Sequence, residues 1–317
     1  MLKALQFVQG VISKKNMIPA LTHFCIRDGR VMGSNGMLTL SSPLNLKMSI
    51  TPKATPFIQA IYRCKGTVSL SLTENGTLLI KSGPFKAYIE CTTDPYPDFA
   101  PEGEFMDVPE NFLQALRLLE VFVADDDSRR WARGVLFRGE SAFATNNIIL
   151  TEYWLGKEFP CEVCIPDPAI KELLRINQIP QKMQVHEDSL TFHFEDGRWL
   201  RTQTFAHSWP PVETILDQMD TSKLKPIDPE LFNSISSLLA FSEELDRVFF
   251  RPGVISTTPT DDAGASIDFH VASKGIYNGR QLLHLQGIAN SIDFESYPNP
   301  SPWFGTNMRG LLAGMKI

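Results

Sequence analysis

The sequence predicts an α+β protein assembled from six similar units, each a short helix combined with antiparallel strands. Three observations favour this class: an apolar-Gln-small-apolar pattern that recurs along the chain, helical segments at regular intervals, and alternating apolar and polar residues between them. With 317 residues, of which 43% are hydrophobic and 21% charged, the chain is long enough to bury more than one core.

The repeated helical pattern occurs at residues 8–11, 58–61, 113–116 and 285–288. Two further stretches with helical periodicity, 168–176 and 229–239, fill the gap between the third and fourth copies. If Gln9, Gln59, Gln114, Glu172, Ser234 and Gln286 are taken as equivalent points, successive spacings lie between 50 and 62 residues. The chain is therefore predicted to be six units of roughly one size.

Proline, acidic and turn-forming residues mark where the predicted helices and strands begin and end. Proline and acidic residues stand at the expected helix starts. Proline is tolerated there because the first-turn N–H groups have no partner within the helix, and a carboxylate is stabilised there by the positive end of the helix dipole. These starts are at 51–52, 108–110, 165–168 and 227–230. Alternating residues predict half-buried antiparallel strands at 67–73, 78–81, 87–90, 185–194 and 266–271, with a turn at 74–76.

Two proline-rich turns, at 94–101 and 208–211, each contain an aromatic-Pro dipeptide and divide the chain into thirds. We expect three similar domains of two units each, at residues 1–103, 104–211 and 212–317. Six such units in a line would leave open sheet edges, and a ring is one arrangement that pairs them.

The composition limits the classes of partner and compartment. A net charge of −6 and a pI of about 5.6 exclude a protein that holds nucleic acid by overall positive charge, so any DNA contact must use a local basic surface. Five scattered cysteines do not form a disulfide framework, which favours the reducing cytoplasm. No export signal or apolar run of about 18 residues occurs, so we expect no membrane span.

An enzyme hypothesis begins with Cys161-x-x-Cys164, a spacing that zinc and thiol redox sites use. The segment is predicted to be a strand, where positions i and i+3 point to opposite faces, so structural cysteines are favoured. The acidic run 125–127 could bind a cation, although a solvated loop fits it better. The six histidines show no metal spacing, and no phosphate-binding glycine loop or nucleophile elbow occurs. We therefore expect no catalysis, metal or cofactor.

The order of several local motifs carries a resemblance. They are the basic segment before Ile18-Pro19-Ala20-Leu21, Lys81-Ser82-Gly83 before a strand, Tyr96-Pro97-Asp98-Phe99, the stretch 127–137 ending in Gly-Val-Leu-Phe, Ala144-Thr145-Asn146 at the start of 144–150, and the terminus 311–317. Over essentially its whole length the chain resembles the β subunit of bacterial DNA polymerase III, the DNA sliding clamp, or a phage-encoded relative.

Three departures from the family pattern accompany the resemblance. In the loop 144–150 only Ala144, Thr145 and Leu150 match, with Asn146 close to the family's aspartate, so partner specificity is expected to differ. The terminus has Ala313-Gly314 where the family has Met-Pro. The sequence begins directly with the first helix, so a truncated edge is expected in the first domain.

The resemblance implies a non-catalytic processivity factor, in which two copies join head to tail as a homodimeric ring with helices inside and sheets outside. The implied partners are double-stranded DNA without sequence specificity, a replicative DNA polymerase and a clamp loader ATPase. An alternative is a clamp-fold scaffold protein that no longer encircles DNA, and its size in solution would separate the two.

Basic residues on or beside the helices are predicted to face DNA phosphates, since phosphate contacts position a protein without reading sequence. Lys15 and Arg63 also match basic positions of the family. Lys171 and Arg175, four residues apart, share a helix face opposite the apolar side. The alternative for each is an ordinary solvated face. The candidates are Lys14, Lys15, Arg63, Lys65, Arg117, Lys171, Arg175 and Arg280.

The resemblance also implies an apolar pocket between the second and third domains, where short peptides of the polymerase and clamp loader dock. Without the resemblance, the apolar C-terminal segment would be interpreted as a buried edge strand. The predicted wall residues are Thr145, Leu150, Leu311, Met315 and Ile317.

Overall fold

The computed structural model describes residues 1–126, 128–204, 208–242, 244–260, 263–271 and 273–316. The chain divides into two compact units, one made of Met1–Leu113 with Pro168–Ala206 and the other of Gln114–Asp167 with His207–Ile317. Both units draw on the middle third of the sequence, and the division into three domains at 103 and 211 stays a prediction. Among the described residues, no helix is both long and apolar enough to cross a membrane.

The expected helices are present, and each buries one apolar stripe. They are α1 (Leu2–Gln9), α2 (Ala54–Arg63), α3 (Phe112–Leu119), α4 (Asp167–Ile176), α6 (Glu230–Leu239) and α7 (Gly279–Leu283). The last one ends earlier than predicted, so that Leu285 and Gln286 lie in the turn that follows. A further helix, α5 (Val212–Asp217), was not predicted.

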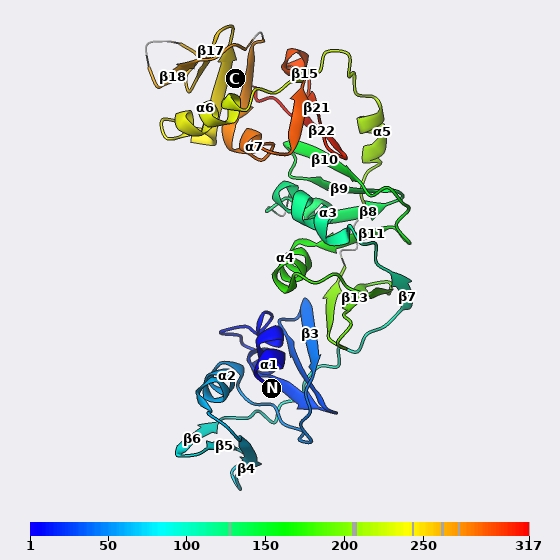
Figure 1. Cartoon of the computed structure of the whole chain (residues 1–317), viewed down its shortest axis with the longest axis vertical. Helices are drawn as coiled ribbons and strands as arrows, with labels where there is room; N and C mark the ends of the chain where they lie inside the picture. The colour runs from blue at the N-terminus through cyan, green and yellow to red at the C-terminus, as the bar shows by residue number, and fades with distance from the viewer. Residues whose placement is uncertain (127, 205–207, 243, 261–262, 272, 317) are drawn as a thin grey trace. The chain divides into compact units, whose positions relative to one another are not determined.

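The first unit contains a seven-stranded antiparallel sheet in the order β1-β2-β3-β14-β13-β12-β7. Its strands are β1 (Cys25–Arg27), β2 (Arg30–Ser34), β3 (Leu38–Pro43), β7 (Glu104–Asp107), β12 (Lys182–Val185), β13 (Ser189–His193) and β14 (Trp199–Gln203). Residues from the first third meet those from the second where Leu40 pairs with Leu200. Helix α1 packs on β2 and β3 (Figure 1).

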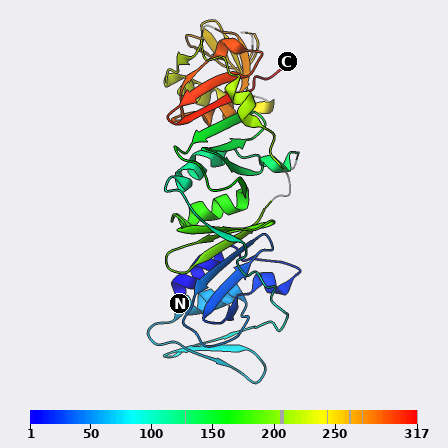
Figure 2. The same ribbon diagram turned by 90° about the vertical axis from the view of Figure 1, so that its right-hand side faces the viewer.

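A separate three-stranded sheet in the first unit comprises β4 (Ser69–Leu72), β5 (Leu78–Ser82) and β6 (Phe85–Ile89), with β5 in the middle. It is drawn in cyan in Figure 2. Helix α2 packs against β6. Neither β4 nor β6 has a second neighbouring strand among the described residues.

The second unit contains an eight-stranded antiparallel sheet in the order β11-β8-β9-β10-β22-β21-β20-β15. Its strands are β8 (Gly134–Arg138), β9 (Ser141–Thr145), β10 (Ile149–Trp154), β11 (Val163–Pro166), β15 (Lys225–Pro226), β20 (Ala289–Ile292), β21 (Ser301–Gly305) and β22 (Met308–Leu312). The second and third thirds of the sequence meet here, where β10 pairs with β22. Helices α3 and α5 lie on opposite sides of this sheet (Figure 1).

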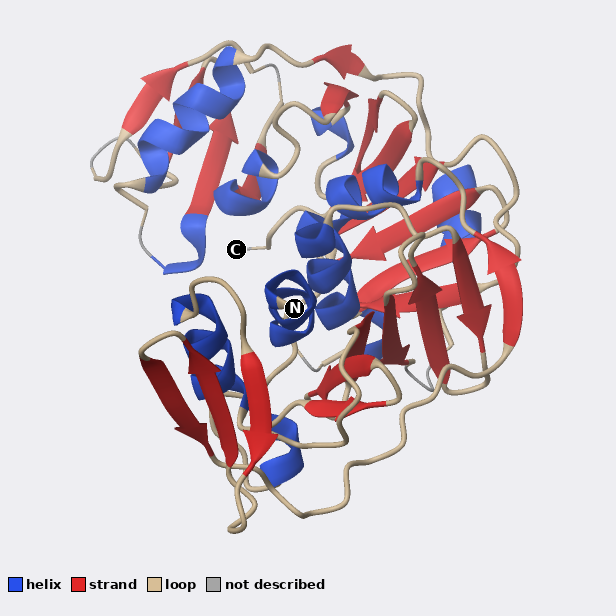
Figure 3. Ribbon diagram, turned by 60° about the horizontal axis from the view of Figure 1, so that its bottom comes forward, coloured by secondary structure: helices blue, strands red, loops and turns tan. Residues whose placement is uncertain are grey.

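A four-stranded sheet completes the second unit in the order β18-β17-β16-β19. Its strands are β16 (Arg247–Arg251), β17 (Val254–Ser256), β18 (Ser266–Asp268) and β19 (Gly275–Asn278). Helix α6 packs on β17 and β18 and also contacts α7. Figure 3 shows how helices, in blue, lie along strands, in red.

The two aromatic-Pro dipeptides occupy corresponding places on the two large sheets. Tyr96 packs against buried Cys25 and Trp199 of the seven-stranded sheet. Trp209 packs in a cluster with Leu136 and Phe143 of the eight-stranded sheet. In each unit the proline-rich turn therefore covers a large sheet, which explains why both turns carry an aromatic ring.

One strand prediction was wrong. Residues 185–194 were expected to form a single strand, but β12 ends at Val185 and β13 begins at Ser189, with a turn between them. The backbone N–H of His186 donates to the carbonyl of Ser189 at 2.9 Å, which closes this turn. Residues 186–189 are His-Glu-Asp-Ser and include no apolar residue, so the alternation is interrupted there and the polar run is the turn signal that the prediction passed over.

Candidate functional sites

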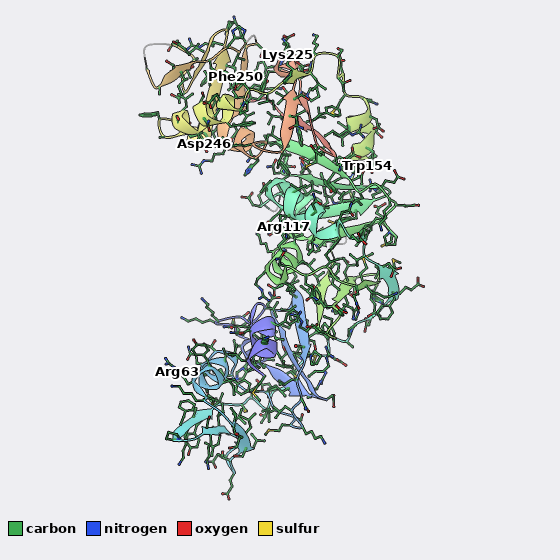
Figure 4. All side chains as sticks on the ribbon, viewed as in Figure 1. Arg63, Arg117, Trp154, Lys225, Asp246 and Phe250 are labelled. Carbon is green, nitrogen blue, oxygen red and sulfur yellow. The ribbon has the colours of Figure 1, made fainter. Side chains whose placement is uncertain are left out.

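Three of the predicted DNA-facing cations lie on the exposed sides of helices. Arg63 ends α2, Arg117 lies in the last turn of α3, and Lys171 lies in α4. All three residues are exposed, whereas the apolar residues of the same helices are buried. Figure 4 marks Arg63 and Arg117 on their helices. The helices thus present positive charge on the side opposite their packed stripe.

Lys14, Lys15 and Lys65 lie in loops directly after α1 and α2, and all three are exposed. Lys14 also lines a cavity of about 470 Å³ between the end of α1 and the start of α2. Loop lysines of this kind can reach a ligand without being fixed in one rotamer.

Arg175 has a structural partner. Its Nε donates to Oε2 of Glu172 at 2.8 Å, and its Nη2 donates to the backbone carbonyl of Phe7 in α1 at 2.9 Å. The bond to the Glu172 carboxylate raises the pKa of the guanidinium. Arg175 therefore compensates a buried carboxylate and ties α4 to α1.

Arg280, in α7, is highly exposed, but its Nε lies 2.7 Å from Oδ2 of Asp246. This ion pair offsets part of its positive charge. The third of the chain that contains α6 and α7 accordingly presents less net charge on its helices than the first two thirds.

Three of the predicted peptide-pocket residues lie in one row across the eight-stranded sheet. Leu150 of β10 pairs with Thr145 of β9 on one side and with Leu311 of β22 on the other. Residues directly opposite each other in an antiparallel sheet point to the same face. Thr145 is buried, whereas Leu150 and Leu311 are half-buried, so the row offers a partly open apolar surface.

The turn between β9 and β10 is organised by two asparagines. The Asn146 Oδ1 accepts hydrogen bonds from the backbone N–H groups of Ile148 and Ile149 at 3.1 and 2.8 Å. Asn147 has φ of 71°, a left-handed conformation that asparagine tolerates better than most residues. Asn146 can therefore perform the turn-forming role of an aspartate, and Asn147 stands where a glycine would be unstrained.

The C-terminal segment is held by backbone hydrogen bonds. The N–H of Ala313 donates to Ile148 at 2.8 Å, and the N–H of Met315 donates to Ile276 at 2.7 Å. The Tyr297 hydroxyl donates to the Met315 carbonyl at 2.9 Å. Met315 is half-buried, and the last predicted wall residue, Ile317, lies outside the described residues.

The sequence did not identify the residues that cover the Thr145-Leu150-Leu311 row. Leu150 and Leu311 pack against a cluster that includes Val212 and Leu216 of α5, with Met219 at its edge. Positions 212, 216 and 219 follow helical spacing, which is the signal that could have found them. They extend the candidate apolar surface beyond the strands.

The two cysteines of the alternative enzyme hypothesis lie in different surroundings from a reactive pair. Burial raises the pKa of the Cys164 thiol to about 12, and its Sγ accepts a bond from Trp209 Nε1 at 3.4 Å. Because the thiolate is the nucleophile and metal ligand, Cys164 has the character of a structural cysteine. In the described part of the chain, no three His, Cys, Asp or Glu side chains are grouped closely enough to hold a metal.

Comparisons by sequence and by structure give different results. No protein-family model matches the chain, and no curated protein is similar to it in sequence. Solved structures are similar over the whole chain. Caulobacter crescentus pol III beta superposes with a TM-score of 0.84 at 17% identity, covering 100% of this chain and 97% of that chain.

Similar structures come from other bacteria. The DNA polymerase sliding clamp of Bacillus subtilis has a TM-score of 0.83 at 16% identity, and DNA polymerase III subunit beta of Pseudomonas aeruginosa has 0.82 at 17%. Each match covers 100% of this chain and 97% of the other. The chain therefore has the α+β fold of the bacterial DNA polymerase sliding clamps from end to end.

Proposed function

We propose that this protein is a DNA sliding clamp, a non-catalytic ring that encircles duplex DNA and tethers a replicative polymerase to it. The observation that carries the proposal is the end-to-end likeness to clamps of three bacterial genera. A closed ring stays linked to DNA topologically, so retention needs no tight or sequence-specific contact. In a cell it would act in the cytoplasm, where the DNA is replicated.

The sheets support assembly from two copies. In each large sheet, one three-stranded meander joins another through their last strands, as β3 joins β14 and β10 joins β22. Two meanders, β4-β5-β6 and β16-β17-β18, have no such neighbour among the described residues. By the same rule, β6 of one copy would pair with β18 of the other, head to tail, and two such seams would close a ring.

Exposed aromatic residues lie on β6 and on or just beyond the helices that pack against the two sheets with unpaired edges. Tyr88 of β6 is 64% exposed and Tyr62 of α2, which packs on β6, is 67% exposed. Phe241, two residues beyond α6, is 64% exposed. Large exposed apolar side chains near both of these sheets favour a protein partner over solvent. A second copy of this chain is the partner that offers the matching edge.

Within such a ring, the cations of the helices would face the phosphates. The candidates are the helix residues Arg63, Arg117, Lys171, Arg175 and Arg280, together with the loop lysines Lys14, Lys15 and Lys65. We rank Lys15 and Arg63 first, because they also match basic positions of the family. Arg175 and Arg280 pair with Glu172 and Asp246 as well.

The row of Thr145, Leu150 and Leu311, together with the residues of α5 that pack against it, would receive apolar peptides from the polymerase and from a clamp loader ATPase, with Met315 and Ile317 proposed as further wall residues. This surface is continuous with a buried cluster, so a docked side chain would extend an existing core. The altered turn at Asn146 and Asn147 would change which peptides fit.

The decisive experiment is retention on circular DNA. Protein loaded onto a nicked circle should stay bound through a high-salt wash and should leave within seconds after a restriction enzyme linearises the circle. Equal loss from both forms would overturn the proposal. A monomer at micromolar concentration would favour the alternative, a clamp-fold scaffold that no longer encircles DNA.

A further inference from the structure

The burial pattern of the helices singles out one central position in each. Gln59 of α2 lies between the buried pairs Phe57-Ile58 and Ala60-Ile61, and is itself exposed. The same pattern of two buried residues, one exposed residue and two buried residues surrounds Gln6 in α1, Gln114 in α3 and Lys171 in α4. Only Gln59 and Gln114 keep their places in the sequence alignment of the repeats, which had placed Gln9, Glu172, Ser234 and Gln286 at this point in the other four helices.

The corresponding exposed positions of the remaining helices are Asn233 in α6 and Arg280 in α7. Side-chain amides therefore occupy four of the six central positions and cations occupy two. No carboxylate occurs at any of the six, although acidic residues outnumber basic ones in the chain, 36 to 30. The exposed centres of the helices thus differ in chemistry from the protein as a whole.

Three of these amides have no structural role in the fold. The side chains of Gln6, Gln59 and Gln114 form no hydrogen bond with any other described residue, whereas Asn233 Nδ2 donates to Glu230 at 3.2 Å. Arg63 follows Gln59 by four residues and Arg117 follows Gln114 by three, so these two amides each share a helix face with a cation. An unpaired amide beside a guanidinium is suited to an anionic ligand with several acceptor oxygens.

We propose that Gln6, Gln59 and Gln114 contact the phosphate backbone of duplex DNA as neutral donors, and so form a low-charge track along which the ring slides. This inference rests on the clamp function proposed above. A cation that binds a phosphate releases a counterion, so its contribution to affinity falls steeply with salt. A neutral amide donates to the same oxygen without that release, and it exchanges readily with water as the duplex moves.

The cations and the amides of the helices are therefore proposed to contribute differently to DNA binding. Arg63, Arg117 and Lys171 supply the salt-dependent attraction that keeps DNA near the helices. The amides supply short contacts whose strength varies little with ionic strength. Sliding requires that no single contact with DNA be strong. A lysine at each of positions 6, 59 and 114 would bind phosphates more tightly and so slow sliding.

The test is equilibrium binding of a fluorescent 30-base-pair duplex, measured by anisotropy over a range of KCl concentrations. The triple variant Gln6→Ala, Gln59→Ala, Gln114→Ala should weaken binding by about tenfold at every salt concentration. The slope of log affinity against log salt should equal that of wild type. Arg63→Ala with Arg117→Ala should reduce the slope by about 0.9 for each phosphate that is no longer neutralised.

A matched control replaces three exposed glutamines outside the helices, Gln181, Gln203 and Gln218, and should bind as wild type does. Thermal melting checks that both triple variants are folded. If wild type binds with a salt slope but the helix triple variant binds equally well, or loses slope, the amide track is refuted while the clamp proposal stands. If wild type is not retained on circular DNA, both proposals fail.

Discussion

The guanidinium of Arg175 in α4 donates a 2.9 Å hydrogen bond to the backbone carbonyl of Phe7 in α1, while its Nε serves the carboxylate of Glu172. Glu172 is 7% exposed, and Arg175 is the cation that pairs with its carboxylate. Gly10 permits the approach, because a Cβ there would clash with both side chains. One arginine therefore joins two helices and balances a buried acid.

Arg175→Ala should lower the free energy of unfolding by about 2 kcal/mol, less than for a fully buried pair because the arginine is partly exposed. Urea denaturation of the whole chain measures the change. Replacing both partners, as Glu172→Leu with Arg175→Met, should recover most of the loss. Lys171→Ala, one position from Glu172 and exposed, should change stability by less than about 0.5 kcal/mol. Equal losses of unfolding free energy in Arg175→Ala and Lys171→Ala would contradict a stabilising role for the contacts of Arg175 with Glu172 and Phe7.

Charge reversal at Lys15 and Arg63 should weaken DNA binding, because both would then repel phosphates. The expected result is a loss of affinity that is largest at low salt, with a salt slope smaller by about 0.9 for each phosphate left without its cation. Anisotropy with a short duplex measures both quantities. Reversal of Lys47 and Lys81, which are exposed but lie outside the helices and the loops that follow them, is the control. Unchanged binding by the first variant would exclude these two residues from the DNA surface.

Deletion of 315–317 should reduce binding of an apolar polymerase peptide by at least about tenfold, since Met315 and Ile317 are proposed to form part of the apolar pocket wall. Isothermal titration with the peptide gives the affinity. Lys316→Ala, an exposed neighbour, should bind normally. A folded truncation that keeps full affinity would refute the pocket.

Tyr88→Asp combined with Phe241→Asp should convert a dimer into a monomer, because the first places a charge on β6 and the second places one just beyond α6, the helix that packs on β18. Light scattering during size-exclusion chromatography gives the mass. Leu72→Asp provides the matched control. Leu72 is 49% exposed on β4, the opposite edge of the same sheet, where no partner is proposed. Dissociation by the control and not by the pair would assign the seam to β4.

The Cys164 thiol should resist iodoacetamide at pH 8 while the protein is folded, because burial raises its pKa to about 12. The ordinary value is 9.0, so the unfolded chain loses this proton first as pH rises. The contribution of Cys164 to stability is therefore fully present below pH 9 and is lost as pH rises toward 12. Mass spectrometry of the alkylated protein, with a urea-unfolded sample as reference, measures the labelling. Rapid labelling of folded protein would restore the thiol-chemistry alternative.

The sequence predicted the six-unit α+β organisation because each unit repeats a helical stripe near an alternating strand. It missed α5, a six-residue helix beginning just after Pro211 and short enough to leave little periodicity. It also misplaced the central position of the repeat in α1, α4, α6 and α7, by one residue in α4. Glu172 was aligned with glutamines as a polar residue, whereas its burial depends on Arg175, a contact that only the packed helices reveal.

The candidate sites were also predicted only in part. The row of Thr145, Leu150 and Leu311 was implied by resemblance, and their adjacency depends on the register of β10 against β22, which no local pattern encodes. The covering residues Val212 and Leu216 come from the unpredicted helix. The DNA contacts of the cations and the wall role of the pocket residues stay predictions.

The pairing of Leu40 with Leu200 has a consequence for biosynthesis. A ribosome adds about 5–20 residues per second, so β14, which pairs with the edge of β3, is synthesised on the order of ten to thirty seconds after β3. During that interval the nascent chain presents an open apolar ladder to its neighbours. Newly made chains should therefore need chaperone protection most while the second third of the message is being translated.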